Sequence, residues 1–171
     1  MLFALVAFII IQRLLELGHA KRNLAWAMAN GGKEFSPEHY PFMVALHSSW
    51  IVAMLLEAWL GGAALSNLWW LWLGLFLIAQ ILRYMVILSL GKLWNTRIII
   101  VPNAKLVRTG LYSFIKHPNY LIVALELFVT PLIFGAWLTA IVFSVLNAIL
   151  LLGFRIPAEE RALKTLQSNM L

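Results

Sequence analysis

The sequence predicts an all-α integral membrane protein with about five transmembrane helices, and three observations support this fold class. Of its 171 residues, 63% are hydrophobic and 12% are charged, whereas a soluble domain is roughly half apolar and a quarter charged. Long apolar runs recur along the whole chain, and these runs are continuous rather than alternating. Because hydrocarbon offers no water to backbone N–H and C=O groups, such runs span a membrane as helices.

The five predicted crossings lie at about residues 1–18, 40–60, 68–90, 120–133 and 137–154 of what we expect to be a single membrane domain. The first run lacks a basic leader and a small-residue cleavage site, so we expect it to be retained rather than removed as a signal peptide. A polar stretch from His19 to Glu38 follows it, with breakers at Asn30, Gly31, Gly32 and Pro37.

The apolar run at residues 121–154 is too long for one helix. Pro131 and Gly135 lie near its middle, and they predict a helical hairpin formed by the fourth and fifth crossings. The second and third crossings are joined by a tight uncharged turn that begins at Gly61. The tail from Pro157 to Leu171 is polar enough to be a short surface helix, with Pro157 in its first turn.

The positions of lysine and arginine predict the orientation. Cations follow the first, third and fifth crossings, whereas the turns after the second and fourth contain none. By the positive-inside rule, the N-terminus is outside and the C-terminus is cytoplasmic, which fits a protein of the cell (inner) membrane. Five tryptophans anchor the uncharged side: Trp59, Trp69, Trp70, Trp72 and Trp137. Orientation therefore explains the net charge of +6, and we predict no nucleic-acid partner.

The residue inventory excludes several kinds of chemistry. The chain has no cysteine, so it has neither a thiolate nucleophile nor a cysteine-ligated metal. Its histidines, which are His19, His39, His47 and His117, show no metal-ligand spacing, and we predict no metal site.

Polar residues interrupt the predicted crossings at similar depths. Gln80 and Arg83 lie in the third, Glu126 lies in the fourth and Asn147 lies in the fifth, all in the cytoplasmic half. Ionisable groups inside a membrane are costly unless they are paired or face a wet cavity. Arg83 and Glu126 are therefore expected to pair. Whether Arg83, Glu126 and Asn147 fix the helix register or line a substrate pocket stays open.

The segment KLVRTGLYSFIKHPNY, at residues 105–120, contains the most chemical detail in the chain. Gly110 allows a turn, Tyr112 and Tyr120 offer aromatic faces, and the His117-Pro118 step breaks the chain where the fourth crossing begins. The segment fits the rim of a pocket, and it also fits a loop that rests at the membrane surface.

A second cluster, RIPAEE, follows the fifth crossing at residues 155–160. Arg155 and Glu159 are four residues apart, so on a continuous helix they share one face. They are suited either to a polar site or to a surface ion pair, and Pro157 leaves the continuity of the helix open.

Together, the two clusters resemble the isoprenylcysteine carboxyl methyltransferase family of membrane enzymes that use S-adenosylmethionine. The resemblance covers residues 90–165 and consists of LGKLWN, KLVRTGLYSFIKHPNY, a hairpin broken at Pro131, and RIPAEERAL, in that order. Lys116 stands where the family usually has arginine, which keeps the charge and loses the planar fork. Leu111 stands where many members have proline. The first three crossings carry no matching motif.

The resemblance implies a set of site residues and a cofactor. The cytoplasmic segments 91–119 and 155–171 would bind S-adenosylmethionine, and Arg155 would position the substrate. The positions that match cofactor contacts of the family are Ala104, Lys105, Leu106, Val107, Tyr112, His117, Pro118, Asn119, Tyr120 and Glu159. These assignments require Tyr120 and Glu159 to face one common cavity.

By the same resemblance, the acceptor would be lipophilic: a prenylated cysteine carboxylate, another lipophilic acid or a hydroxylated polyketide. A carboxylate needs little acid–base help, whereas a phenol or enol would need a base, for which His117 and Glu126 are the candidates. The oligomeric state has no signal in the sequence.

Two other functions remain as alternatives. An NADPH-dependent reductase of the steroid 5α-reductase type has a similar His-Pro-x-Tyr element, although this chain lacks an additional basic cluster for a 2′-phosphate. The other alternative is a non-catalytic membrane subunit.

Overall fold

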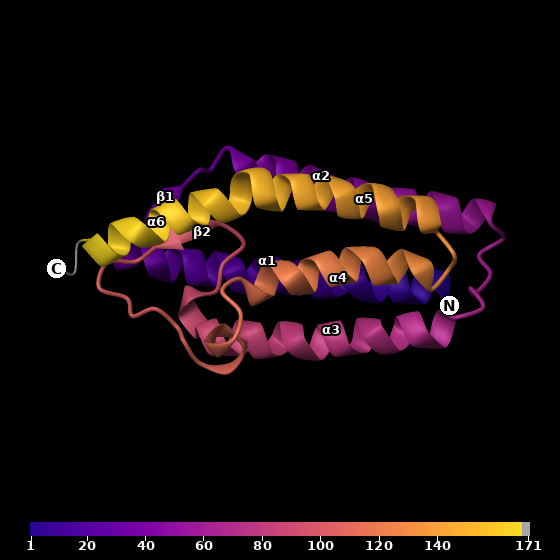
Figure 1. The fold of residues 1–171 in the computed structure, drawn as a ribbon, viewed down its shortest axis with the longest axis horizontal. Coiled ribbons are helices and arrows are strands. Elements are labelled where there is room, and N and C mark those ends of the chain that lie inside the picture. Colours follow the sequence, from indigo (N-terminus) through magenta and orange to yellow (C-terminus); the bar gives the residue numbers. More distant parts are fainter. Residues whose placement is uncertain (169–171) are drawn as a thin grey trace.

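The computed structural model describes the backbone of residues 1–168 and the side chains of residues 1–164. The last residues of the predicted tail, 169–171, lie outside the described part. The fold is a bundle of long helices with a two-stranded sheet at one end (Figure 1). Its elements are, in order, α1 (Leu2–Ala29), β1 (Lys33–Phe35), α2 (His39–Leu60), α3 (Trp69–Leu90), η1 (Gly91–Leu93), β2 (Ile98–Ile100), η2 (Gly110–Ser113), α4 (Pro118–Leu132), α5 (Trp137–Leu150), η3 (Leu151–Arg155) and α6 (Ile156–Ser168).

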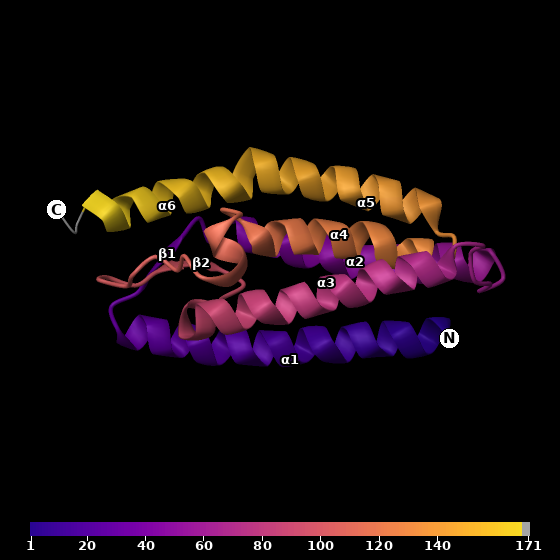
Figure 2. The same ribbon diagram turned by 60° about the horizontal axis from the view of Figure 1, so that its bottom comes forward.

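Four helical stretches are long and apolar enough to cross a membrane: 2–29, 39–60, 69–93 and 137–164. The helix α4 is equally apolar but shorter. It packs between α3 and α5, with α2 also in contact (Figure 2). The core centres on Trp50, Met54 and Leu127, and the Trp50 indole donates to the Leu127 carbonyl oxygen at 3.1 Å. By contrast, Leu60 and Leu88 are about four-fifths exposed, as expected of side chains that face lipid.

The N-terminus and the two uncharged turns share one end of the bundle (Figure 1). There the Ser66 N–H donates to the Ile133 carbonyl oxygen at 3.0 Å. Glu57 at the end of α2 accepts hydrogen bonds from the main-chain N–H groups of Leu138 and Thr139, at 2.9 and 2.7 Å. The carboxylate thereby caps the start of α5, where the macrodipole favours a negative charge. The charged connecting segments and the C-terminal helix lie at the opposite end.

The helix that contains the first predicted crossing extends well beyond residue 18, because α1 continues to Ala29. Its final turns bury Ala20, Asn23 and Ala27 on one side. The Asn23 amide donates to the carbonyl oxygens of Gly91 and Trp94, at 3.1 and 2.7 Å. A polar sequence thus remains helical because one of its faces packs against the segment that follows α3.

The short sheet is absent from the sequence-based prediction. Strands β1 and β2 pair antiparallel, with Glu34 opposite Ile99. Strands of three residues give no alternating pattern to read, and the pairing joins segments that are more than sixty residues apart. The one available signal was the β-branched run 98–100, within an otherwise polar loop.

The predicted hairpin between α4 and α5 is confirmed, and the chain turns at Gly135 with φ of +68°. The fifth helix differs from its prediction because it passes through the π-helical turn η3 directly into α6. Pro157 has no N–H to donate, and its ring would crowd the carbonyl group of Gly153 in a regular α-helix. The wider turn accommodates Pro157, so the helix is continuous across RIPAEE.

Candidate functional site

A cavity of about 660 Å³ occupies the charged end of the bundle. Its lining comes from α1, α2, α3, the start of α4, the end of η3, α6, and the loops on either side of β2. Ligand sites in proteins are typically clefts of about 300–1,000 Å³, lined by apolar side chains and a few polar groups. The cavity fits this description.

The loop from Val101 to His117 forms one wall, and two residues fix its path. Gly110 has a φ of +58°, and a Cβ atom there would approach the Ser89 Oγ to 2.9 Å, so both the backbone conformation and the space favour glycine. Pro118 keeps His117 out of the helical conformation, which starts α4 at this position. The first turn of α4 therefore presents Asn119 and Tyr120 to the cavity.

The hydroxyl group of Tyr120 joins two charged residues of the opposite wall. It donates to Oε2 of Glu159 and accepts from Nε of Arg155, the latter at 3.2 Å. Arg155 also donates from Nη2 to the Thr96 carbonyl oxygen at 2.6 Å. The expected common cavity for Tyr120 and Glu159 is thus present in the structure.

Arg155 is 4% exposed, so the interpretation of a surface ion pair is wrong. Within residues 1–164, Arg155 forms no ion pair, and its Nη1 makes no hydrogen bond. A buried guanidinium without a carboxylate is costly unless a ligand or another polar group compensates it. Since Arg155 lines the cavity, its unused donors are available to an anionic group of a ligand.

The two carboxylates of α6 also contact the end of the loop before α4, and Glu159 lies 3.8 Å from Nδ1 of His117. Glu160 lies 3.2 Å from Nζ of Lys116 and 3.4 Å from Nε2 of His117. The His117 ring stacks on Tyr120, with ring centroids 5.8 Å apart. These contacts keep the loop and α6 together as opposite walls of the cavity.

The chain from Ala104 to Val107 lines the cavity and has no regular secondary structure. Within the described part of the protein, the main-chain N–H groups of Lys105, Leu106 and Val107 donate no hydrogen bond. They are therefore open to acceptor atoms of a ligand.

Tyr112 lines the same cavity. Burial raises the pKa of its phenol, and the nearby Glu159 carboxylate adds to the shift, so Tyr112 stays protonated.

A buried network of charged and amide groups lies deeper in the bundle. Its members are Gln12, Arg13, Glu16, Gln80, Arg83 and Glu126. Arg83 binds Glu126 at 2.8 Å, which confirms the expected pair, and it also binds both carboxylate oxygens of Glu16 at 2.5 and 2.8 Å. Arg13 contacts the same two carboxylates, at 2.9 and 2.5 Å. Two cations and two anions thus form a closed, neutral set that we call the buried quartet.

The structure brings together most of the residues singled out in the sequence. The cavity is lined by Ala104, Lys105, Leu106, Val107, Tyr112, His117, Asn119, Tyr120, Arg155 and Glu159, together with Arg83. Three others do not line it: Pro118 is fully buried at the start of α4, Glu126 lies behind Arg83 in the quartet, and Asn147 is fully buried on α5.

Several residues that line the cavity were not among the predicted site residues. Thr96 holds Arg155 through a main-chain carbonyl group, for which no side-chain pattern exists. Arg13 and Glu16 were visible as charges near the end of the first apolar run, and their spacing of three places them on one helix face. That spacing was the available signal that the quartet has members on α1.

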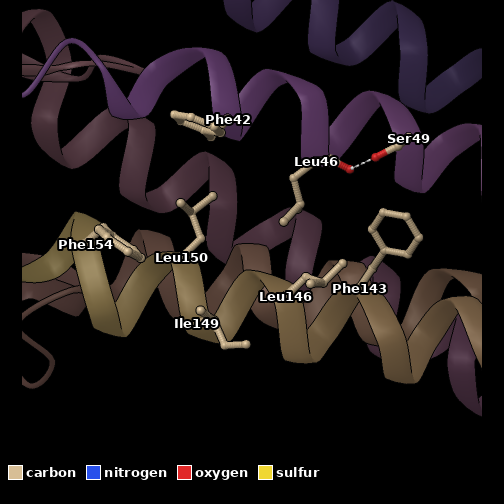
Figure 3. A pocket seen from close by; sticks show the side chains of 8 residues that line it. All are labelled: Phe42, Leu46, Ser49, Phe143, Leu146, Ile149, Leu150 and Phe154. Carbon is tan, nitrogen blue, oxygen red and sulfur yellow. Dashed lines mark hydrogen bonds between the residues drawn. The ribbon is translucent and has the colours of Figure 1, made fainter.

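A second, smaller hollow of about 260 Å³ lies between α2 and α5 (Figure 3). Its lining is apolar except for Ser49, whose hydroxyl donates to the Ala45 carbonyl oxygen of its own helix at 2.7 Å. The groove offers no free polar group among its lining residues. The polar groups that suit a cofactor line the larger cavity.

Comparison with known proteins gives the same assignment as the sequence motifs. The chain is 38% identical over 165 residues to the uncharacterized protein YpbQ of Bacillus subtilis. The alignment covers 96% of this chain and 97% of YpbQ. It is also 26% identical to an uncharacterized protein of Haemophilus influenzae, and that alignment covers 97% of this chain and 98% of the relative. No solved structure matches. The model of the isoprenylcysteine carboxyl methyltransferase family matches residues 72–165, which is more than half of the chain, so the protein belongs to the isoprenylcysteine carboxyl methyltransferase family.

Proposed function

We propose that the protein is an S-adenosylmethionine-dependent methyltransferase that methylates an oxygen atom, preferably a carboxylate oxygen, of a lipophilic acceptor such as a prenylcysteine. The observation that carries the proposal is the arrangement of Tyr120, Arg155 and Glu159 around one cavity. Family membership indicates a membrane methyltransferase. The cofactor and the acceptor are what membership of this family implies, and the chemistry of the cavity supports both.

The chemical groups of the cavity suit S-adenosylmethionine. The cofactor supplies an electrophilic methyl group on a sulfonium centre, and it also carries an ammonium, a carboxylate and an adenine. The faces of Tyr112 and Tyr120 attract a sulfonium or stack on adenine. Glu159 accepts hydrogen bonds from an ammonium or from ribose hydroxyls. The unpaired N–H groups of residues 105–107 suit acceptor atoms of the adenine edge or the carboxylate.

Arg155 is the residue that we assign to the acceptor. Its position between Tyr120 and Thr96 fixes the guanidinium plane, while Nη1 remains available. A guanidinium binds a carboxylate in a two-pronged geometry and so fixes the direction of its oxygen atoms. Alignment of two reactants in this way lowers a barrier by up to about 7–11 kcal/mol. A carboxylate acceptor is already ionised, so the reaction needs no general base.

The membrane arrangement agrees with such a reaction. We infer five crossings, namely the four long apolar helices together with the shorter α4, which is the fourth crossing in chain order. We also infer an external N-terminus and a cavity that faces the cytoplasm. The lysines and arginines at the cavity end support this orientation through the positive-inside rule. A polar cofactor then reaches the cavity from the aqueous side, whereas a lipophilic acceptor arrives from the bilayer between helices. Leu17 of α1 and Val44 of α2 line the cavity and are more than 40% exposed, which makes the α1–α2 side the expected entrance.

Methyl transfer is tested with membranes from cells that express the protein. Incubation with methyl-labelled S-adenosylmethionine is expected to label a lipid-extractable product, which mass spectrometry then identifies. Membranes with the Arg155→Ala variant are the matched control, and they should yield no such product. Base-labile label indicates a methyl ester and hence a carboxylate acceptor. Absence of labelled product from membranes that contain folded wild-type protein and a lipid extract of the native host contradicts the proposal.

A further inference from the structure

Helix α2 lies between the large cavity and the apolar groove described above, and it presents a different surface to each. Phe42, Leu46 and Ser49 face the apolar groove (Figure 3). The other face lines the large cavity at helical spacing, through Tyr40, Met43, Val44, His47, Ser48 and Ile51. The imidazole of His47 is the titratable group of this stripe that lies deepest in the bundle.

One nitrogen of the His47 ring is already committed. Nδ1 lies 2.8 Å from the carbonyl oxygen of Met43, one turn earlier on α2. A carbonyl oxygen only accepts hydrogen bonds, so Nδ1 carries the hydrogen. In a neutral imidazole, the other nitrogen is then an acceptor without a hydrogen. In the described part of the chain, Nε2 of His47 has no hydrogen-bond partner.

The surroundings favour the neutral ring. An imidazolium within the membrane-spanning region needs a carboxylate beside it. The membrane-embedded carboxylates of this region, Glu16 and Glu126, are each bound by both Arg13 and Arg83. His47 forms no ion pair with any carboxylate of residues 1–164. Its Nε2 is therefore a hydrogen-bond acceptor on the cavity wall.

His47 lies deeper than the groups assigned to the reaction. The rings of His39 and Phe154 pack with centroids 5.9 Å apart, so the start of α2 is level with the residue before Arg155. His47 follows His39 by eight residues, which is about 12 Å at a rise of 1.5 Å per residue. Between these levels, Met43 and Val44 contribute apolar lining.

We infer that the acceptor carries a hydroxyl group, or another hydrogen-bond donor, on its apolar part, and that this donor binds Nε2 of His47. The inference rests on the proposed function for its identification of the ligand as the methyl acceptor. Among the lipophilic acceptors of the proposed function, this favours a molecule with such a donor on its apolar part over an unsubstituted prenylcysteine. Its two polar groups, one near Arg155 and one at His47, are separated by about 12 Å along the bundle. His47 selects the acceptor and positions it, and takes no part in bond making.

Matched amphiphiles test the inference without any methyl transfer. The probes are 10-hydroxyoctadecanoate, 10-oxooctadecanoate and octadecanoate, measured by equilibrium dialysis against purified protein at a fixed detergent concentration and without cofactor. The hydroxyl donates and accepts, whereas the ketone only accepts. Wild-type protein is expected to bind the hydroxy acid about fivefold or more tightly than the oxo acid. Equal affinities, or tighter binding of the oxo acid, overturn the inference.

Two substitutions separate the roles of the ring nitrogens. In His47→Asn, the shorter amide still reaches the Met43 carbonyl oxygen but leaves nothing at the position of Nε2, so the preference should disappear. In His47→Gln, the longer amide places an acceptor near that position, so part of the preference should remain. A preference that survives unchanged in His47→Asn overturns the assignment to His47. Because no cofactor is present, failure of methyl transfer alone would leave this result intact, and the two proposals fail separately.

Discussion

At the scale of single residues, the hydroxyl group of Tyr120 connects two side chains that the sequence places on one helix. Arg155 and Glu159 do not bind each other, and Tyr120 lies between them from the opposite wall. The phenol donates to the carboxylate and accepts from the guanidinium, so each charge is held without being neutralised. Both charged groups can therefore still form hydrogen bonds with a ligand.

The first prediction concerns Arg155. Arg155→Lys keeps the positive charge but loses the planar fork, and Arg155→Ala loses both. A hydrogen bond to a charged group contributes about 1.5–3 kcal/mol, so methyl transfer should fall by at least about tenfold in the lysine variant and further in the alanine variant. Initial rates in membranes are the measurement. Arg161→Gln, on the exposed side of α6, is the matched control and should be unaffected. Full activity of Arg155→Ala removes Arg155 from the reaction.

The second prediction concerns Tyr120. Tyr120→Phe keeps the aromatic face and the stack on His117, but it releases Glu159 and Arg155. The affinity for S-adenosylmethionine should fall by about tenfold, the effect of one lost hydrogen bond to a charged group. Isothermal titration of the purified variant measures it. An unchanged dissociation constant shows that the hydroxyl does not organise the site.

Many residues that line the candidate site were predictable from the sequence, but the contacts among them were not. Motif and spacing identified Tyr120, Arg155 and Glu159, because the resemblance covers these positions in order. The bonding among them depends on the wide turn η3, which sets the direction in which Arg155 points. The departure from regular helix geometry follows from Pro157 only once the chain is known to continue as a helix beyond it.

At the scale of elements, the buried quartet joins α1, α3 and α4 in the membrane-spanning region. Every carboxylate oxygen of Glu16 and Glu126 accepts at least one hydrogen bond from an arginine or glutamine. Charges in hydrocarbon are tolerated when they are satisfied in this way. The quartet therefore fixes the register of three helices, and its Arg13, Glu16 and Arg83 form the polar floor of the cavity.

The third prediction follows from this closed set. Arg83→Ala leaves two buried carboxylates with only Arg13 as a cation, and loss of one partner from a buried ion pair costs about 3–5 kcal/mol. Thermal unfolding in detergent should show a clear fall in melting temperature. Arg22→Gln, an exposed cation on the same protein, is the control and should melt like wild type. Equal melting temperatures for Arg83→Ala and wild type contradict a structural role of the quartet.

Element boundaries were predictable where a local signal ends a helix. The break at Pro131 and Gly135 was predicted and is present, because both residues act locally. The extension of α1 to Ala29 was not predicted, since its polar final turns are stabilised by contacts such as that of Asn23 with Trp94. The sheet of β1 with β2 was also missed, because pairing across a long stretch of chain leaves no local trace.

At the scale of the whole molecule, the two ends of the bundle differ in charge and in chemistry. One end carries the uncharged turns, tied together by the Ser66 to Ile133 hydrogen bond. The other carries the basic loops and the cavity (Figure 1). This polarity is the physical basis for the proposed orientation.

The fourth prediction tests the orientation, and the lack of cysteine makes it clean. Asn67→Cys lies in an uncharged turn, and Ser113→Cys lies in η2 at the cavity end, so each variant has a single thiol. A membrane-impermeant maleimide added to spheroplasts should label the first variant and spare the second until the cells are lysed. The reverse pattern contradicts the orientation. Equal labelling of both thiols before lysis contradicts a membrane-spanning bundle.

Binding of S-adenosylmethionine to the purified protein tests the central claim most directly. Isothermal titration should give saturable binding of one equivalent to wild type, with weaker binding to Glu159→Gln, because a neutral amide is a poorer partner for an ammonium than a carboxylate. The control Glu38→Gln changes an exposed carboxylate outside the cavity and should bind like wild type. NADPH should not bind. Saturable binding of NADPH, or no binding of S-adenosylmethionine to folded wild-type protein, would contradict the account.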